Sequence, residues 1–389
     1  MSEWKKVKLG ELYEVHNGLS KGRQFFGTGF PFLTFSDVFN NWFLPEQLES
    51  LVQTTDKERE ACSIKAGDVF ITRTSETMDE LGMSSVALKD YPNATYNGFT
   101  KRLRPKTDRV FPRYMGYYLR TPKFRGQFMA FSSMTTRASL ANNDLLNMEV
   151  ELPPMDIQKN IATILSRYDS LIENYQKQIK LLEEAAQRLY KEWFIDLHFP
   201  EHENTNIIDG VPEGWEKKKV GEIAIISAGG DKPDVVTEEQ TTECQVPIYS
   251  NGTTKEGLYG YTNKSSNTAG SITISARGSI GFACLRMHDY FSIVRLISIK
   301  PQNNVDLMYL FQFTKVHTFM SNGAAQQQLT VPMVKAIDVV YPAESLLEAF
   351  ENVVLPLYKK VQSLQSQLRL LTEARDRLLP KLMGGEITV

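Results

Sequence analysis

Two long stretches of the chain place apolar residues at steps that alternate between three and four. In the first stretch the apolar positions are Ile161, Leu165, Tyr168, Ile172, Tyr175, Ile179, Leu182, Ala186, Leu189 and Trp193. Because a helix has 3.6 residues per turn, this spacing keeps one narrow stripe on one face. Since it persists over more than four heptads, it predicts a coiled-coil helix, which needs a partner helix to cover the stripe.

The partner helix is predicted in the same chain. A second stripe lies 189 residues further on, at Phe350, Val354, Leu357, Val361, Leu364, Leu368, Leu371, Arg375, Leu378 and Leu382. Arg375 is the one charged position in it. We expect the two helices to cover each other's stripes, and the repeat favours an antiparallel pair. The residues expected in the seam and in partner docking are Leu165, Tyr168, Ile172, Ile179, Leu182, Leu189, Trp193, Leu357, Val361, Leu364, Leu371 and Leu378.

Prolines frame both predicted helices. Those at 153–154 and Pro342 end the segments that precede the helices. Asp156 and Ser345 then follow as candidate N-caps. Pro356 lies near the start of the second helix, where it removes a backbone hydrogen bond. We therefore expect a kink or a break at this point.

The remaining parts of the chain also occur twice. Three pairs of segments show the repeat: Trp4–Leu12 with Trp215–Ile223, Lys65–Arg73 with Thr268–Arg277, and Leu140–Pro154 with Leu329–Ala343. A repeat of this length predicts one structural unit written twice. The expected parts are a globular domain at 1–155, a long helix at 156–195, a linker at 196–212, a second globular domain at 213–343 and a second long helix at 344–389.

Within each domain the pattern is rich in short strands. Alternating segments at 68–73 and 271–275 follow Ala-Gly turns, and 84–88 and 281–285 are expected to pair with them. Closing strands are expected at 148–152 and 337–341, and some helix at 112–119 and 305–314. The predicted fold class is therefore α/β (α+β), with two similar globular domains separated by two long antiparallel helices and related by a pseudo-twofold repeat.

Composition adds limits to this picture. The chain is 42% hydrophobic and 23% charged and has no apolar run long enough for a membrane span. It starts without the apolar stretch of a signal peptide, and its three cysteines lie far apart, so we expect a cytoplasmic protein. The net charge of −2 argues against an indiscriminate nucleic-acid binder but allows positive charge on one face.

No catalytic motif was found. The GxxxxGK[ST] phosphate loop is missing, as are a glycine-rich S-adenosylmethionine motif and the Asn/Asp-Pro-Pro-Tyr motif of amino-methyltransferases. His198 and His202 stand four residues apart, but Pro200 lies between them. Two exposed linker histidines are the better interpretation, so we expect no catalytic residue and no metal ligand.

Positive charge is concentrated between Lys101 and Arg137, a stretch that contains ten Lys or Arg residues and one acidic residue, Asp108. Phenylalanine and tyrosine residues are interleaved with them. Such a stretch could neutralise DNA phosphates. The alternative is that the charges are ordinary surface residues and the aromatic side chains belong to the core.

Smaller polar and basic clusters occur in predicted loops, at matching places in the two domains. Arg and Gln are the side chains that pair bidentately with guanine and adenine. The candidate DNA-binding residues are Lys21, Arg23, Arg73, Thr74, Lys101, Arg102, Arg137, Lys255, Arg277, Ser279 and Gln327.

Taken together, the pattern resembles the specificity (S) subunit of type I restriction–modification enzymes. The segments that carry this resemblance are the starts of the two domains, at Trp4–Leu12 and Trp215–Ile223, and the ends of the two helices, at Leu189–Phe194 and Leu378–Ile387. The resemblance implies a subunit without a catalytic site, whose two target-recognition domains each read one half of a split DNA sequence. The helices would hold the domains apart.

The resemblance also implies the partners. Modification (methyltransferase) subunits, two in number, would bring S-adenosylmethionine and methylate adenine in double-stranded DNA. Restriction subunits, where present, would bring ATP and Mg²⁺. No membrane partner is expected. The alternative function is a two-headed adaptor, in which the domains bind proteins and the coiled coil spaces them.

Overall fold

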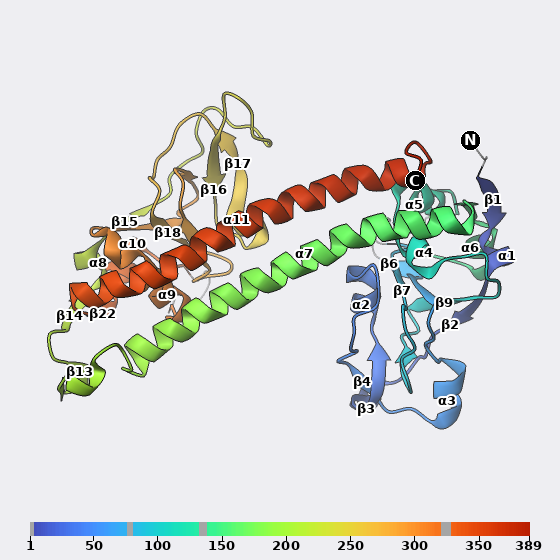
Figure 1. Ribbon diagram of the computed structural model, residues 1–389, viewed down its shortest axis with the longest axis horizontal. Helices are drawn as coiled ribbons and strands as arrows, with labels where there is room; N and C mark the ends of the chain where they lie inside the picture. The colour runs from blue at the N-terminus through green and yellow to red at the C-terminus, as the bar shows by residue number, and fades with distance from the viewer. Residues whose placement is uncertain (1–3, 76–80, 132–137, 320–327) are drawn as a thin grey trace. The chain divides into compact units, whose positions relative to one another are not determined.

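The computed structural model describes residues 4–75, 81–131, 138–319 and 328–389 (Figure 1). These residues form two compact units. Unit 1 comprises Met1–Asn174 with Leu368–Val389, and unit 2 comprises Tyr175–Gln367. Each unit therefore combines one globular domain with part of each long helix.

The globular domain of unit 1 is built from short strands and short helices. Its strands are β1 (Lys5–Lys8), β2 (Tyr13–Asn17), β3 (Phe26–Leu33), β4 (Leu51–Val52), β5 (Val69–Thr72), β6 (Thr74–Ser75), β7 (Ser84–Val86), β8 (Thr95–Tyr96), β9 (Thr100–Pro105), β10 (Ala138–Ser139) and β11 (Glu149–Leu152). Its helices are α1 (Leu9–Leu12), α2 (Phe35–Asn40), α3 (Asp56–Ala61), α4 (Pro112–Tyr118), α5 (Pro122–Phe131) and α6 (Asn142–Asn147).

The globular domain of unit 2 uses the same kinds of element. Its strands are β12 (Ile207–Ile208), β13 (Val211–Pro212), β14 (Glu216–Lys219), β15 (Ala224–Ala228), β16 (Val246–Tyr249), β17 (Leu258–Thr262), β18 (Ser271–Ile274), β19 (Ala283–Arg286), β20 (Phe291–Ser292), β21 (Ile297–Pro301) and β22 (Asp338–Tyr341). Its short helices are α8 (Val220–Ile223), α9 (Leu307–Val316) and α10 (Val331–Lys335).

The two domains have the same sheet topology, which confirms the predicted duplication. A four-stranded sheet has the order β2-β9-β5-β7 in unit 1 and β15-β21-β18-β19 in unit 2. A three-stranded sheet has the order β4-β3-β8 in one and β17-β16-β20 in the other. The first and last strands of each domain pair antiparallel, as β1 with β11 and β14 with β22. The strands expected at 68–73, 84–88 and 148–152 and their repeats are all present.

The repeated Gly-Glu motif has a packing role in both domains. In unit 1, a Cβ on Gly10 would lie 3.1 Å from the carbonyl oxygen of Leu146, which is closer than an ordinary contact, so glycine favours the close approach of α1 to α6. The Glu11 carboxylate accepts the backbone N–H of Lys8, and in unit 2 Glu222 does the same for Lys219. The motif therefore fixes a short helix between two strands by satisfying the free donors at its start.

The long helices are continuous in sequence: α7 runs over Met155–Tyr190 and α11 over Glu344–Met383, drawn in green and red in Figure 1. A π-helical turn, Lys191–Ile195, extends α7. Both helices begin one residue before the candidate N-caps Asp156 and Ser345, so these two assignments are wrong. Pro154 and Ala343 precede the helices instead.

The expected break at Pro356 is wrong, because α11 runs as one helix through this residue, and the expected kink stays a prediction. The missing hydrogen bond leaves the carbonyl of Asn352 without its helical donor. Asn352 and Pro356 are both exposed, so water can take the place of that donor. A proline on the solvent side of a helix is thus tolerated here.

The helices run antiparallel, as each unit shows separately. In unit 1 the first part of α7 meets the last part of α11, where Asp169 pairs with Arg375. In unit 2 the end of α7 meets the start of α11, where the rings of Tyr190 and Phe350 are 6.2 Å apart. The predicted seam faces inward: Leu165, Ile172, Val361 and Leu364 are buried, and Tyr168, Ile179, Leu182, Leu189, Trp193, Leu357, Leu371 and Leu378 are half-buried.

Arg375, the charged position in the second stripe, has specific partners within unit 1. Its guanidinium lies 2.9 Å from the Asp169 carboxylate and 5.4 Å from the centroid of the Trp42 ring. The Tyr117 hydroxyl donates to the other oxygen of Asp169. Both charged side chains are about four-fifths buried, and Arg375 is the cation paired with Asp169, while Arg375 itself also pairs with the neighbouring Asp376 at 2.9 Å.

We predict that Arg375→Met destabilises unit 1 by about 1–3 kcal/mol, because it leaves the Asp169 carboxylate buried without its cation. A double-mutant cycle with Asp169→Asn, measured by chemical denaturation, should give a coupling energy of about 1 kcal/mol or more. Arg377→Met is the matched control, since its ion pair with Glu373 lies on the exposed face. Additive effects at Asp169 and Arg375 would contradict the assignment.

A buried carboxyl group joins the domain of unit 2 to α11. Glu351 accepts the backbone N–H of Met308 at 2.9 Å, in the first turn of α9. Burial raises the pKa of Glu351 to about 7, and the nearby Asp306 adds to the rise while Lys359 opposes it. Folding therefore favours the protonated form of Glu351.

The raised pKa predicts that stability falls as the pH rises from about 4.5 to about 7, because the folded state holds a proton that the unfolded state releases. Above pH 7 this contribution should level off. Glu351→Gln should flatten the dependence and stabilise the protein at pH 8 by about 1–2 kcal/mol. Denaturation curves at pH 5, 6, 7 and 8 test this, with the exposed Glu348→Gln as control. An unchanged slope in Glu351→Gln would contradict it.

Candidate nucleic-acid interface

The basic stretch that begins at Lys101 contributes mainly to the interior of the first domain. Arg102 is 3% exposed and donates to the carbonyl oxygens of Ser63 and Ala61, at 2.6 and 3.4 Å. Lys101 is 4% exposed and donates to the side chain of Asn142. Burial also lowers the pKa of Lys101. Lys101 and Arg102 were expected to contact DNA. The structure argues against this, because their charged groups lie within the domain.

Other cations of the same stretch are neutralised by neighbours. Arg104 forms a two-point ion pair with the fully buried Asp68, at 2.6 and 2.8 Å. Arg120 donates to four backbone carbonyl oxygens, and Lys123 pairs with Glu151. The aromatic residues between them are core: Tyr114, Tyr117, Tyr118, Phe124 and Phe128 are buried. In the described part of this stretch these rings belong to the core, as the alternative interpretation expected, but Arg102, Arg104 and Arg120 bind acceptors within the domain and are not ordinary surface charges.

Lys21 and Arg23 have different surroundings. The Lys21 ammonium lies 2.7 Å from the Glu58 carboxylate and over the ring of Phe25. This contact, with the Thr55 N–H, lowers the pKa of Glu58 to about 2. Arg23 is exposed, in a short 3₁₀ turn. Of the two, Arg23 is the cation more accessible to a ligand.

Arg73 and Thr74 lie where β5 ends. The N–H of Arg73 donates to the carbonyl oxygen of Phe99, and its own carbonyl accepts from Leu140. Thr74 pairs with Ser139 in a two-stranded ladder of β6 and β10. Arg137 lies outside the described residues.

In the second domain, the candidate residues lie on exposed loops. Lys255, Arg277 and Ser279 are all exposed, and Arg277 donates to the side chain of Gln328 at 3.0 Å. Gln327 lies outside the described residues. Here the sequence-based candidates remain accessible to a ligand.

A side chain that the sequence analysis did not single out holds these loops together. The Asn251 amide oxygen accepts the N–H of Ala276 at 2.7 Å, and its amide nitrogen donates to the carbonyl of Val294 at 2.7 Å. One asparagine thus links the loop that carries Arg277 to the turn between β20 and β21. Nothing in the sequence near Asn251 marks it for this role, because both contacts are distant along the chain.

Matching loops meet at the same end of the main sheet in each domain. In unit 1, β2, β9 and β5 are antiparallel neighbours, and the ladders end with Asn17 opposite Lys101 and Thr72 opposite Thr100. The end of β2, the turn before β9 and the segment after β5 must therefore lie together. We call this end of each sheet the loop edge. In unit 2 it comprises the end of β15, the turn before β21 and the loops at 250–257 and 276–281.

Equivalent glycines allow close approach at both loop edges. A Cβ on Gly18 would lie 2.1 Å from the carbonyl oxygen of Asn97, and one on Gly229 would lie 2.6 Å from the N of Ile293. These contacts exclude any side chain there. The backbone after β2 or β15 is thereby held against the following turn.

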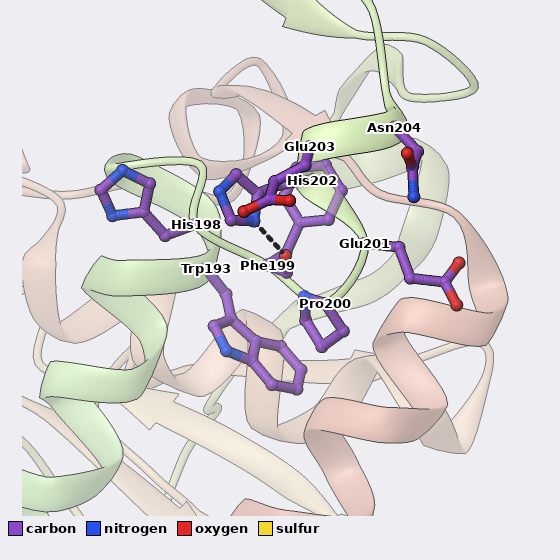
Figure 2. Close-up of a pocket in the computed structure, with 8 residues that line it drawn as sticks. All are labelled: Trp193, His198, Phe199, Pro200, Glu201, His202, Glu203 and Asn204. Carbon is purple, nitrogen blue, oxygen red and sulfur yellow. Dashed lines mark hydrogen bonds between the residues drawn. The ribbon is translucent and has the colours of Figure 1, made fainter.

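The linker histidines line a pocket of about 420 Å³ at the end of α7, with Trp193, Phe199, Pro200, Glu201, Glu203 and Asn204 (Figure 2). Their ring centroids are 5.4 Å apart. The Nδ1 atom of His202 lies 2.9 Å from the Phe199 carbonyl oxygen, so one of its ring nitrogens is engaged in the loop. Across the described ranges, no group of three or more His, Cys, Asp or Glu residues could hold a metal ion.

No helix in the described part of the chain combines the length and hydropathy that a membrane crossing requires.

The family described as the type I restriction modification DNA specificity domain matches the chain twice, over residues 1–184 and 212–345. The chain belongs to this family. It is a type I restriction–modification specificity subunit with two DNA specificity domains, which agree with the two repeats of the fold.

Relatives are similar over the whole length. The MjaIX specificity subunit of Methanocaldococcus jannaschii is 26% identical, covering 100% of this chain and 94% of that protein. The HindI specificity subunit of Haemophilus influenzae is 21% identical, with 100% of both covered. The crystal structure of the S subunit from M. genitalium matches with a TM-score of 0.66 at 16% identity, covering 97% and 96% of the two chains. This last likeness concerns the fold.

We predict different consequences for two arginines that the sequence grouped together. Arg102→Ala should lower the unfolding midpoint and reduce stability by about 2 kcal/mol, because it removes a buried charged hydrogen bond to the Ser63 carbonyl, which keeps only its bond from Arg104. Arg277→Ala should leave the midpoint unchanged and weaken DNA binding. If Arg277 contacts a phosphate, its loss should reduce the slope of log affinity against log salt by about 1. Thermal melts and salt titrations separate the two. Equal destabilisation by both variants would contradict the assignment.

Proposed function

We propose that this specificity subunit is non-catalytic and that each globular domain reads one half of a bipartite DNA target. The observation that carries the proposal is the duplication, strand for strand, of two sheets with the same loop edge. Two equivalent readers in one chain suit a target in two parts. Exposed Lys255, Arg277 and Ser279 would contribute contacts to DNA at the loop edge of unit 2, and exposed Arg23 would contribute a contact in unit 1.

The long helices would set the spacing between the half-sites. An uninterrupted helix of 36 residues, such as α7, has a length of about 54 Å. Half-sites one helical turn apart on the same face of DNA are about 34 Å apart, centre to centre. A spacer of this length is therefore of the right scale for two sites on one face.

Catalysis is assigned in this proposal to partner subunits. Two modification subunits would bring S-adenosylmethionine and methylate adenine after taking the base out of the stack. Restriction subunits would bring ATP and Mg²⁺. Since the target is genomic DNA, the complex would act in the cytoplasm.

Docking of the modification subunits would use the outer faces of the helices rather than the seam. The seam side chains are already covered by helix pairing. Leu171 in unit 1 and Leu181 in unit 2 are 44% and 53% exposed on α7, and Leu370 in unit 1 is 59% exposed on α11. Exposed leucines on a helix suit contacts with another protein surface.

Domain exchange tests the bipartite reading. Replacing residues 213–343 with the equivalent domain of a relative should change one half of the methylated sequence and leave the other half and the spacing unchanged. The measurement is methylation mapping of DNA exposed to the complex of this chain with its modification subunits. The reciprocal exchange of residues 4–152 should change the other half only.

Two further outcomes would count against the proposal. Methylation by the purified chain alone would contradict a non-catalytic role. DNA affinity that does not fall with salt would favour the two-headed protein adaptor, since phosphate contacts release counterions.

A further inference from the structure

A four-residue turn closed by the same backbone hydrogen bond lies at both loop edges, although its two central residues have positive φ only in unit 2. In unit 1 it is formed by Asn97–Thr100 and in unit 2 by 293–296. The N–H of Thr100 donates to the carbonyl of Asn97 at 3.0 Å, and that of Leu296 donates to Ile293 at 3.1 Å. Each turn follows a short strand that pairs parallel with its neighbour, β8 with β3 and β20 with β16.

Both turns are also attached to the rest of the domain in the same way. The N–H of Gly98 donates to the carbonyl of Leu19 at 2.9 Å, and the N–H of Val294 donates to Gly230 at the same distance. Since these bonds match residue for residue, Phe99 and Arg295 occupy equivalent positions at the tips of the two turns.

The tips are joined to the neighbouring loops by different bonds. In unit 1 the carbonyl of Phe99 accepts directly from Arg73. In unit 2 the Asn251 side chain bridges Val294 and Ala276, which is the equivalent of Arg73. Each tip residue thus projects from a turn that is fixed on both sides.

Neither tip side chain has a structural role that would explain it. Phe99 is 59% exposed, which is unfavourable for a large apolar ring in water. Arg295 is exposed and, among the described residues, forms no ion pair, unlike Arg286, which is paired with Glu256. Val294 and Arg295 have φ values of 52° and 60°, which L side chains rarely adopt and which are enriched at functional sites.

We propose that Phe99 and Arg295 are specificity-determining residues of the two half-sites. Phe99 makes an apolar contact with the C5-methyl group of a thymine, and Arg295 donates two hydrogen bonds to N7 and O6 of a guanine. This inference rests on the proposed function and adds to it the residues that read one base pair in each half.

The experiment on Phe99 uses the full chain with its modification subunits and the target defined by methylation mapping. Phe99→Ala should relax the requirement for one thymine in one half-site, with about a tenfold loss of discrimination. Deoxyuridine at that thymine lacks the methyl group. It should weaken binding of the wild type by a similar factor and leave binding of Phe99→Ala unchanged.

The experiment on Arg295 uses the other half-site. Arg295→Ala and Arg295→Lys should both relax the requirement for one guanine, since lysine keeps the charge but lacks the two-point geometry. Replacing that guanine with 7-deazaguanine removes the N7 acceptor. It should weaken the wild type and have no further effect on either variant.

Control variants keep these results interpretable. Leu88→Ala removes an apolar side chain, 38% exposed, beyond the opposite end of the same sheet, and should change no base preference. Lys217→Ala removes an exposed charge from β14 in unit 2. Thermal melts confirm that all variants fold.

Two results would overturn the inference while leaving the proposed function intact. One is Phe99→Ala weakening all DNA sequences equally. The other is Arg295→Lys retaining full specificity, which would indicate a phosphate contact. If the wild-type complex methylated no bipartite sequence, the proposed function itself would fail.

Discussion

The pairing of the first and last strands of each globular domain is the constraint on which the rest depends. In unit 1, β1 and β11 lie antiparallel with Lys5 opposite Leu152, and α7 begins three residues after that partner. In unit 2, β14 and β22 pair with Glu216 opposite Tyr341, and α11 begins at Glu344. Both ends of each domain are therefore fixed beside the start of a helix. A domain whose ends lie together can be exchanged without altering the path of the chain around it.

This closure also explains which sequence features the two halves share. The Gly-Glu motif stands directly after the first strand and contacts the helix directly before the last one, α6 or α10. The motif thus supports the closure in each domain, through Gly10 in unit 1 and through Gly221 in unit 2. The loop edge is a separate part of each domain. Its residues are free to differ, and they do: the bridge that Asn251 forms in unit 2 is a direct backbone bond in unit 1.

The long-range pattern of the sequence predicted the architecture well, whereas local charge did not predict which basic side chains are buried. A stripe of ten apolar positions has few physical outcomes, so the helix pair and the repeat followed from spacing alone. Arg102 shows the opposite case. Whether a basic side chain can bind phosphate depends on which protein groups the fold brings next to it. For Arg102 these groups are carbonyls some forty residues earlier in the chain. The break expected at Pro356 is absent for a related reason, because the effect of this proline depends on whether its face of the helix is exposed to water.

Stability and recognition are assigned to different arginines and aromatic residues in this chain. Arg102, Arg104 and Arg120 satisfy interior acceptors, so each is tied to the fold and cannot change freely. Phe99 and Arg295 project from turns whose described hydrogen bonds are made by backbone atoms and by the side chains of Asn97, Thr100 and Asn251, so a different side chain at either tip would leave those bonds intact. A reader of DNA built in this way can acquire a new base preference without first losing its fold.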